Sequence, residues 1–259
     1  MGTIDLVIDR GIATVTINNP ERRNAMTLAM WQSLGSTVIG LDTRQDVRLV
    51  VLRGAGERAF ISGADIKEFE ALRTDPESVA RYDQAIAQAQ AALMQCAKPT
   101  IASIAGACFG GGIGLAAACD LRYAASDARF CMPAARLGLG YAQDGMRRLV
   151  EVVGSVRAAE LFYTARVFDG NEAARIGFVQ AAYPADMLLS EVAAISARIA
   201  ENAPLTVRAA KLAIGQILGH DGIDPGQVSM AVEQCFRSED YREGQAAFKQ
   251  KRDPVFHGR

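Results

Sequence analysis

Residues 104–114 of this chain have the sequence IAGACFGGGIG, with three consecutive glycines, Gly110–Gly112. The apolar run Thr100–Ile104 predicts a buried strand before them, and Ile113–Ala118 predicts a helix after them. Glycines at such a junction let the backbone approach a ligand closely, because no Cβ intervenes. The first N–H groups of a helix have no partner inside the helix, and the helix dipole adds partial positive charge there. The segment therefore favours a site for an anion or a developing oxyanion, although the glycines could also serve only close helix–strand packing.

A second glycine-containing segment lies at residues 59–66 and has the sequence AFISGADI. Its Gly63-Ala64-Asp65 stands at the predicted start of a short helix, where a backbone N–H could supply a second donor. A purely structural role of the glycines fits either segment equally well when each is taken alone. A dinucleotide-binding fingerprint from Gly112 to Ala117 is a weak alternative, because no acidic residue follows at the required distance and the chain begins with a hairpin.

The other elements follow from hydrophobic periodicity and from turn and cap residues. Alternating residues predict a hairpin of Thr3–Arg10 and Ile12–Asn18, and Thr27 is a good N-cap for a helix to Leu41. Further predicted elements are a strand at Leu49–Leu52, a loop at Glu57–Ser62, a helix at Pro76–Gln95, strands at Leu121–Ala124 and Arg129–Met132, and a strand around Phe178–Ala182 within an otherwise helical part after Gly145. This order predicts an α/β fold with a helical C-terminal part beyond a boundary near Pro204.

Composition narrows the classes of function. With 28 Lys and Arg against 29 Asp and Glu, the formal net charge is −1, so we expect no basic face for nucleic acid. Pro99–Cys119 carries no charge, but proline and glycines interrupt it, so we expect a buried strand and helix there rather than a membrane span. We expect no signal peptide. The five scattered cysteines are typical of reduced thiols in a cytoplasm and lack metal-site spacing.

Taken together and in this order, the segments resemble the crotonase (enoyl-CoA hydratase/isomerase) superfamily over nearly the whole chain. Residues 18–20 (NNP) and 23–26 (RNAM) are similar to the N-terminal loop of that family. The GADI segment and the glycine run are similar to its two oxyanion-hole elements. Residues 133–149 are similar to its next active-site loop, and the sequence FKQKR at residues 248–252 is similar to its basic tail.

The resemblance implies a crotonase-like spiral of strand-strand-helix units with a C-terminal helical trimerisation region, and a homotrimer or a dimer of trimers. We therefore expect an acyl-CoA-binding core at residues 1–200 and a helical region at residues 201–259. The backbone N–H groups of Ala64 and Gly111 would hold the oxygen of a CoA thioester. Coenzyme A is then part of the substrate, and no separate cofactor, metal, nucleic acid or membrane partner is expected.

The resemblance also implies contacts with CoA. They would come from Arg23 and Ala25, from the segment Asp65-Ile66-Lys67, and from Lys249 or Lys251, which a neighbouring subunit could supply. Lysine ammonium groups suit the phosphates of CoA. A solvated tail is the commoner explanation for two such lysines.

The chain departs from the family at the two glutamates that its hydratases use. The corresponding residues are Gly114 and Ala134, and neither side chain can move a proton. Tyr141 and Asp144 of the next loop remain as catalytic candidates. Tyr141 is similar in position to a tyrosine of methylmalonyl-CoA decarboxylase, or could be an aromatic packed at the mouth of the site. Asp144 could be an acid or base, or only the N-cap of the helix that follows.

These residues favour an acyl-CoA lyase or isomerase that relies on its oxyanion hole. Decarboxylation of a malonyl-type thioester needs only enolate stabilisation, and migration of a double bond needs one proton shuttle. Hydration by a relocated carboxylate ranks behind these reactions. A catalytically silent acyl-CoA-binding protein is the alternative from another class, since it too could retain the oxyanion segments without the acids.

Overall fold

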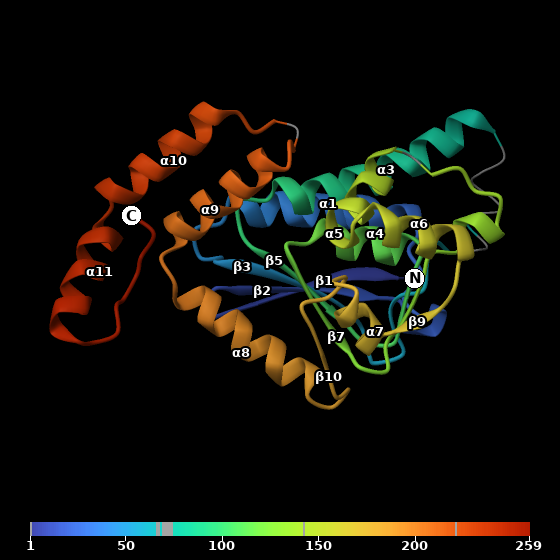
Figure 1. Ribbon diagram of the computed structural model, residues 1–259, viewed down its shortest axis with the longest axis horizontal. Helices are drawn as coiled ribbons and strands as arrows, with labels where there is room; N and C mark the ends of the chain where they lie inside the picture. The colour runs from blue at the N-terminus through green and yellow to red at the C-terminus, as the bar shows by residue number, and fades with distance from the viewer. Residues whose placement is uncertain (1, 66–67, 69–74, 142, 221) are drawn as a thin grey trace.

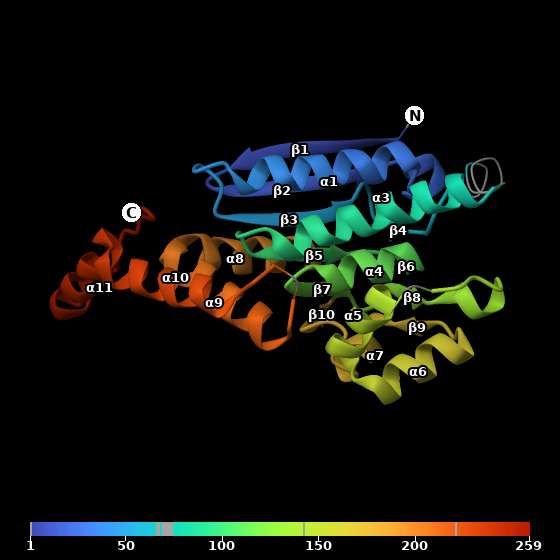
Figure 2. The ribbon, with the colours of Figure 1, turned by 90° about the horizontal axis from the view of Figure 1, so that it is seen from above.

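The computed structural model describes residues 2–65, 68, 75–141, 143–220 and 222–259. In this part of the chain, six strands form a larger sheet in the order β1-β2-β3-β5-β7-β10, and four form a smaller sheet in the order β4-β6-β8-β9. Figures 1 and 2 show their arrangement. The bounds are β1 Thr3–Asp9, β2 Ile12–Asn18, β3 Leu49–Gly54, β4 Ala59–Ile61, β5 Thr100–Ile104, β6 Ala107–Phe109, β7 Leu121–Ala125, β8 Arg129–Cys131, β9 Phe168–Asp169 and β10 Ala181–Tyr183.

Consecutive units of two strands and a helix build the two sheets. The strands β1 and β2 pair antiparallel in the larger sheet, and the helix α1 (Leu28–Asp42) follows them. In the later units the first strand joins the larger sheet in parallel and the second joins the smaller sheet, as β3 and β4, β5 and β6, and β7 and β8 do. Each of these three later units therefore adds one strand to each sheet, which is the predicted crotonase-like spiral.

Helices cover both faces of the larger sheet. The helices α1, α3 (Pro76–Gln95) and α4 (Gly111–Ala118) lie side by side on one face, and α8 (Leu188–Glu201) lies on the other (Figure 1). The buried strands β3 and β5 are accordingly almost continuously apolar. The remaining helical elements are η1 Pro20–Arg22, η2 Pro133–Arg136, α5 Gln143–Val153, α6 Ser155–Thr164, α7 Gly170–Arg175, α9 Pro204–Ile217, α10 Pro225–Arg237 and α11 Glu239–Gln250.

Most of the longer predicted elements are confirmed. The predicted hairpin is β1 and β2, and both α3 and β5 have the predicted bounds. Thr27 is the N-cap of α1, and its hydroxyl oxygen accepts a hydrogen bond from the N–H of Met30 at 3.2 Å. Local signals predict these elements well because each is long enough to show its periodicity or carries a specific cap.

The prediction fails for some short strands, although the three-residue β8 (Arg129–Cys131) confirms the strand predicted at Arg129–Met132. The predicted loop Glu57–Ser62 contains β4, and the glycine segment contains β6. The strand predicted around Phe178–Ala182 starts only at Ala181, and Phe178 is buried in the connection before it. The strands β4 and β6 are three residues long, which is too short for alternation to identify them reliably. They form because neighbouring segments offer partners for their backbone groups.

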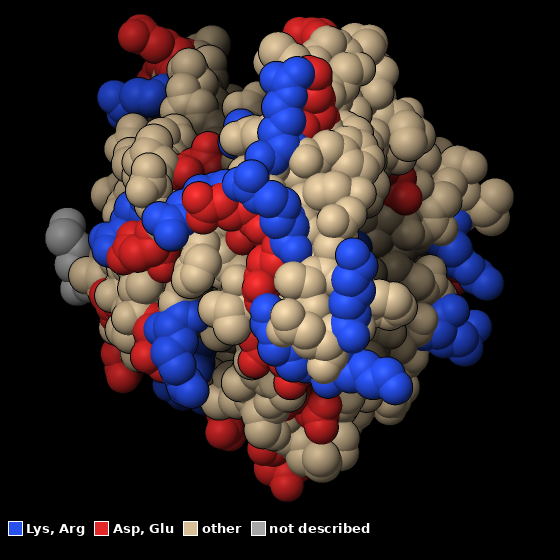
Figure 3. All heavy atoms as spheres, turned by 90° about the vertical axis from the view of Figure 1, so that its left-hand side faces the viewer, with Lys and Arg blue, Asp and Glu red and all other residues tan. Residues whose placement is uncertain are grey.

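The C-terminal helices α9–α11 extend from one end of the molecule (Figures 1 and 2). Lys211 of α9 connects them to the core, since its Nζ donates to a carboxylate oxygen of Asp120 at 2.7 Å and to the carbonyl of Lys98 at 3.0 Å. The helix α8 ends at Glu201, and the predicted division after residue 200 stays a prediction. Figure 3 shows acidic and basic side chains interspersed on this end of the molecule.

The last residues of the chain fold back onto α11. The carboxylate of Asp240 is 3 % exposed and accepts hydrogen bonds from the N–H groups of His257 at 2.7 Å and Gly258 at 2.8 Å. Arg48 donates to the carbonyl of Phe256 at 2.7 Å. The tail therefore joins α11 to the segment that precedes β3.

All five cysteines are free thiols, and four of them are buried. Burial raises the pKa of the Cys119 thiol to about 12. Within the residues that the structure describes, no helix combines the length and the apolar character needed to cross a membrane, and no group of His, Cys, Asp and Glu side chains could hold a metal ion.

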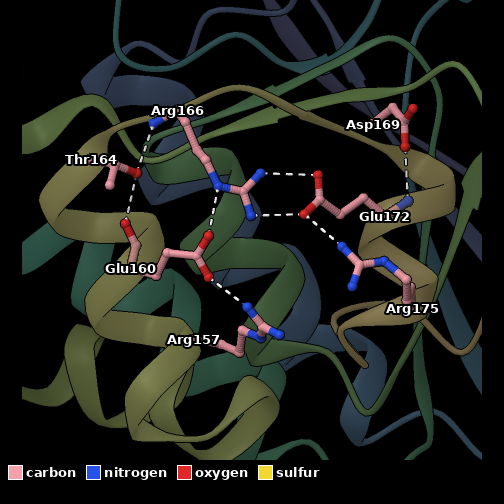
Figure 4. A network of polar contacts seen from close by, with 7 residues as sticks. All are labelled: Arg157, Glu160, Thr164, Arg166, Asp169, Glu172 and Arg175. Atoms are coloured by element: carbon pink, nitrogen blue, oxygen red, sulfur yellow. Dashed lines mark hydrogen bonds and ion pairs between the residues drawn. The ribbon is translucent and has the colours of Figure 1, made fainter.

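A network of charged side chains joins α6, β9 and α7 (Figure 4). Arg166 donates from Nε to Glu160 at 3.0 Å and forms two further hydrogen bonds with Glu172, at 2.9 and 2.7 Å. Its guanidinium also lies 5.7 Å from the centre of the Phe168 ring. The hydrogen bond from Arg166 is the main cause that lowers the pKa of Glu172.

We expect this network to make the free energy of unfolding depend on acidic pH. Because the pKa of Glu172 is lower in the folded chain than its ordinary value of 4.5, its ionised form contributes stability above that value. That stability is lost as the pH falls through the lowered pKa. Arg166→Met should therefore show a shallower loss of stability than the unchanged protein in urea titrations between about pH 6 and pH 3. Arg175→Met is the control, because Arg175 is 65 % exposed and forms a single bond to Glu172. Equal slopes for all three proteins would contradict the expectation.

Candidate active site

Three parallel strands end at one edge of the smaller sheet. The strand β4 pairs with β6, and β6 pairs with β8, both in parallel, so their carboxyl ends meet where α/β proteins commonly bind ligands. Ser62–Asp65, Gly110–Gly112 and η2 follow these ends. A Cβ at Gly112 would lie 2.8 Å from the carbonyl oxygen of Ile61, so a side chain there would push the first two segments apart.

Ala64 is held by a parallel bridge to Met26. The carbonyl of Gly63 accepts from the N–H of Met26 at 2.9 Å, and the N–H of Asp65 donates to the carbonyl of Met26 at 3.0 Å. In a parallel bridge the middle residue directs its own N–H to the opposite side. Among the described residues, no acceptor takes the N–H of Ala64. The N–H of Ala64 is therefore left open to a ligand, and its role as an oxyanion donor stays a prediction.

Gly111 is the first residue of α4. The preceding Gly110 has a φ of +52°, a conformation that favours glycine, and its N–H donates to the carbonyl of Cys131 at 2.9 Å. The described part of the chain supplies no acceptor for the N–H of Gly111, which stands at the positive end of the helix dipole. Two donors of this kind at one sheet edge suit a carbonyl oxygen that gains negative charge.

The space beside Gly114 holds a side chain that the sequence analysis missed. Gly114 is three residues beyond Gly111, about 4.5 Å along the helix axis. A Cβ at Gly114 would lie 2.6 Å from Nε2 of Gln90, on α3, and 3.4 Å from the hydroxyl oxygen of Tyr141. Gln90 has no sequence signal that distinguishes it from Gln88 of the same helix, so only the packing of α3 against α4 identifies it.

Tyr141 is both packed and directed toward the site. Its ring makes an edge-on contact with Phe162, with centroids 5.3 Å apart. Burial raises the pKa of the Tyr141 hydroxyl, so the group stays protonated at neutral pH and can donate. Ala134, which the resemblance assigns to the second glutamate position, is 5 % exposed within η2. Neither Gly114 nor Ala134 presents an acid, as the sequence indicates.

Three of the predicted CoA-binding residues lie beside Ala64. The carbonyl of Arg23 accepts from the N–H of Ser62 at 3.2 Å, and Ala25 precedes the bridged Met26. The carboxylate of Asp65 is buried and forms an ion pair with Arg22. A cavity of about 460 Å³ opens next to this pair, lined by Gly2, Thr3, Asn18, Asn19, Pro20, Glu21, Arg22, Thr27 and Asp65. Binding of CoA by Arg23, Ala25 and Asp65 stays a prediction.

The structure does not place the side chains of three further candidates. Ile66 and Lys67 lie outside the described residues, as does the side chain of Asp144. The helix α5 begins at Gln143, so Asp144 lies inside its first turn and is not the predicted N-cap.

The two lysines of the tail lie elsewhere in the chain. Lys249 and Lys251 are exposed at the end of α11, at the opposite end of the molecule from β4 and β6 (Figures 1 and 2). They are therefore not part of the site of their own chain, and a role for them in a neighbouring subunit stays a prediction.

Comparisons with known proteins extend over the whole chain. Residues 7–259 match the family described as Enoyl-CoA hydratase/isomerase. A crotonyl-CoA hydratase of Syntrophomonas wolfei is 35% identical over 251 residues, which are 95% of this chain and 94% of that protein. A Delta(3,5)-Delta(2,4)-dienoyl-CoA isomerase of Dictyostelium discoideum is 32% identical over 257 residues, which are 95% of this chain and 87% of that protein. The solved enoyl-CoA hydratase of Bacillus anthracis superposes with a TM-score of 0.92 at 32% identity, over 99% of this chain and 100% of the other.

Proposed function

Because the chain belongs to the enoyl-CoA hydratase/isomerase family, whose members act on CoA thioesters, we propose that it holds the thioester oxygen on the N–H groups of Ala64 and Gly111. Both groups lie at the same sheet edge and lack an acceptor among the described residues. They do not ionise, and they stabilise the negative charge of an enolate without reorganising. Loss of one such donor typically slows an enzyme by ~10²–10³, so two donors account for substantial catalysis.

The reaction that we favour is loss of CO₂ from a malonyl-type thioester. One observation carries this choice: the neutral side chains of Gln90 and Tyr141 lie beside Gly114, which the resemblance, together with Ala134, assigns to the positions of the two hydratase glutamates. Hydration needs one group to deprotonate water and another to protonate the α-carbon. A carboxylate at either position would also repel the carboxylate of the substrate.

In the proposed step, the bond between the α-carbon and the carboxylate breaks. Its electron pair forms the thioester enolate, and CO₂ leaves. The α-carbon then takes a proton from the hydroxyl of Tyr141, which regains one from water. One malonyl-type thioester and one proton thus give one CO₂ and one shortened acyl-CoA.

Migration of a double bond is the second candidate. The similarity to the dienoyl-CoA isomerase favours it, and Asp144 would then be the proton shuttle. A hydratase with a relocated carboxylate and a catalytically silent acyl-CoA-binding protein are the further alternatives.

We also propose a homotrimer or a dimer of trimers that assembles through residues 201–259. Large apolar side chains of this region support the proposal, since Ile217 is 82 % exposed, Phe236 is 62 % exposed and Phe248 is 86 % exposed. Such surface is commonly covered by another chain. We propose a cytoplasmic location. The proposal includes no cofactor beyond the CoA of the substrate and no nucleic-acid or membrane partner.

A mass-spectrometric turnover assay tests the reaction. We expect malonyl-CoA or methylmalonyl-CoA to lose CO₂, and we expect Tyr141→Phe to slow this loss more than Asp144→Asn does. Crotonyl-CoA should remain unhydrated. Migration of the double bond of a 3-enoyl-CoA by the unchanged protein, but not by Asp144→Asn, would instead establish an isomerase. Rapid hydration would show that an acid acts from another position, and tight binding without any turnover would favour the silent binder.

A further inference from the structure

Gln90 and Tyr141 come from different elements and meet beside Gly114. Gln90 belongs to α3, and Tyr141 precedes α5. Nε2 of Gln90 and the hydroxyl oxygen of Tyr141 lie 2.6 and 3.4 Å from the position of a Cβ at residue 114. A larger residue at Gly114 would have to displace Gln90. The glycine therefore makes room for a polar pair that a glutamate at this position would exclude.

Packing holds the helix backbone at Gln90 and the ring of Tyr141. The neighbours of Gln90 on α3, Ala89 and Leu93, are completely buried, which fixes the helix backbone. The ring of Tyr141 lies between Phe162 and Gly145, where a Cβ would be only 2.7 Å from the ring. Polar groups held in this way bind a ligand without a large loss of side-chain freedom.

The chemistry of the pair is that of neutral hydrogen-bond donors. The amide of Gln90 offers two N–H donors, and the protonated Tyr141 offers one O–H donor. Neither group can take a proton from water at neutral pH. Hydrogen bonds to an ionised acceptor are shorter and stronger than those between neutral groups. A carboxylate is therefore a better ligand for this pair than a hydroxyl or a methyl group.

The position of the pair relates it to the oxyanion donors. Gly111 and Gly114 are separated by one turn of α4, about 4.5 Å along the axis. An acyl group with its thioester oxygen at Gly111 would thus place its next carbons along the turn that leads to Gly114.

We propose that Gln90 and Tyr141 bind a carboxylate carried by the α-carbon of the acyl group, and that they select malonyl-type thioesters over simple acyl thioesters. This inference rests on the proposed function, because it takes the thioester oxygen to lie on Ala64 and Gly111. It adds the residues that recognise the substrate class.

Binding measured by calorimetry tests this selection without turnover. The probes are acetyl-CoA and sulfoacetyl-CoA, whose sulfonate carries the negative charge but cannot leave as CO₂. We expect the unchanged protein to bind sulfoacetyl-CoA at least about tenfold more tightly, since a hydrogen bond to a charged group contributes more than a neutral one. In Gln90→Leu most of this preference should disappear, while the affinity for acetyl-CoA changes by less than about twofold. Gln90→Glu should reverse the preference through charge repulsion.

Gln88→Leu is the matched control, because Gln88 lies on the same helix and is exposed. It should keep the preference for sulfoacetyl-CoA. A preference that survives in Gln90→Leu, or an unchanged protein that binds both probes equally, would overturn the inference. If the protein decarboxylates malonyl-CoA but its preference for sulfoacetyl-CoA does not depend on Gln90, the proposed function is supported and this inference is overturned. A preference that depends on Gln90, in a protein that does not release CO₂, supports this inference and overturns the proposed reaction.

Discussion

Replacement of Gly111 by proline is expected to lower kcat by about 10²–10³-fold, the usual cost of removing one oxyanion donor. Proline lacks the N–H that we propose to hold the thioester oxygen. Gly111 is the first residue of α4 and does not have a positive φ, so proline is compatible with the backbone there. The change therefore removes the donor with little effect on the helix itself.

Gly111→Ala is the control for the added bulk. A Cβ at this position would lie 3.1 Å from the indole ring of Trp31 in either variant, but alanine keeps the N–H. We expect Gly111→Ala to retain most of its kcat, measured by release of CO₂ at saturating substrate. Equal losses in the two variants would assign the effect to packing on Trp31. A proline variant that still turns over normally would contradict the oxyanion role of Gly111.

Replacement of Trp31 by alanine is expected to lower the free energy of unfolding by about 3–5 kcal/mol. Trp31 is 1 % exposed and is one of the largest fully buried side chains of the core. Truncation loses its transfer free energy and leaves a cavity beneath Gly111 that the surrounding backbone can only partly fill. The measurement is denaturant unfolding at one fixed protein concentration, because association of subunits also contributes to stability.

Trp31→Phe separates the effect of volume from that of hydrogen bonding. Among the described residues, Nε1 of Trp31 has no hydrogen-bond partner, so phenylalanine removes no bond. We expect the loss for Trp31→Phe to be clearly smaller than for Trp31→Ala. If the two variants lost the same stability, the cavity explanation would be wrong.

The long elements of the fold are predictable because each shows its own pattern. The helix α3 is preceded by Asp75, which caps it, and has a proline in its first turn, and β5 is a fully buried strand whose only polar residues are Thr100 and Ser103. The strands β4 and β6 are not predictable in this way, because they consist of three residues each and depend on pairing with each other. Their existence follows from tertiary contacts that a local pattern does not contain.

The residues of the candidate site also differ in whether a local sequence pattern or a tertiary contact identifies them. Ala64 and Gly111 can be proposed from the sequence, because the glycine segments are visible there and the resemblance assigns the two donors to their backbone. Gln90 is not predictable, because its role depends on the contact between α3 and the bare Gly114. The sequence shows that Gly114 and Ala134 carry no acid, and the structure shows which side chain lies in the space beside Gly114.

The oxyanion donors that we propose belong to the main chain, and this separates two kinds of evolutionary change. Any amino acid except proline supplies an N–H at residues 64 and 111, so the hole persists through most substitutions that keep the backbone in place. The surrounding side chains at residues 90, 114, 134 and 141 can then be exchanged, and the fate of the enolate changes with them. A new reaction can thus arise in this scaffold from a few local substitutions, while the group that activates the thioester is inherited unchanged.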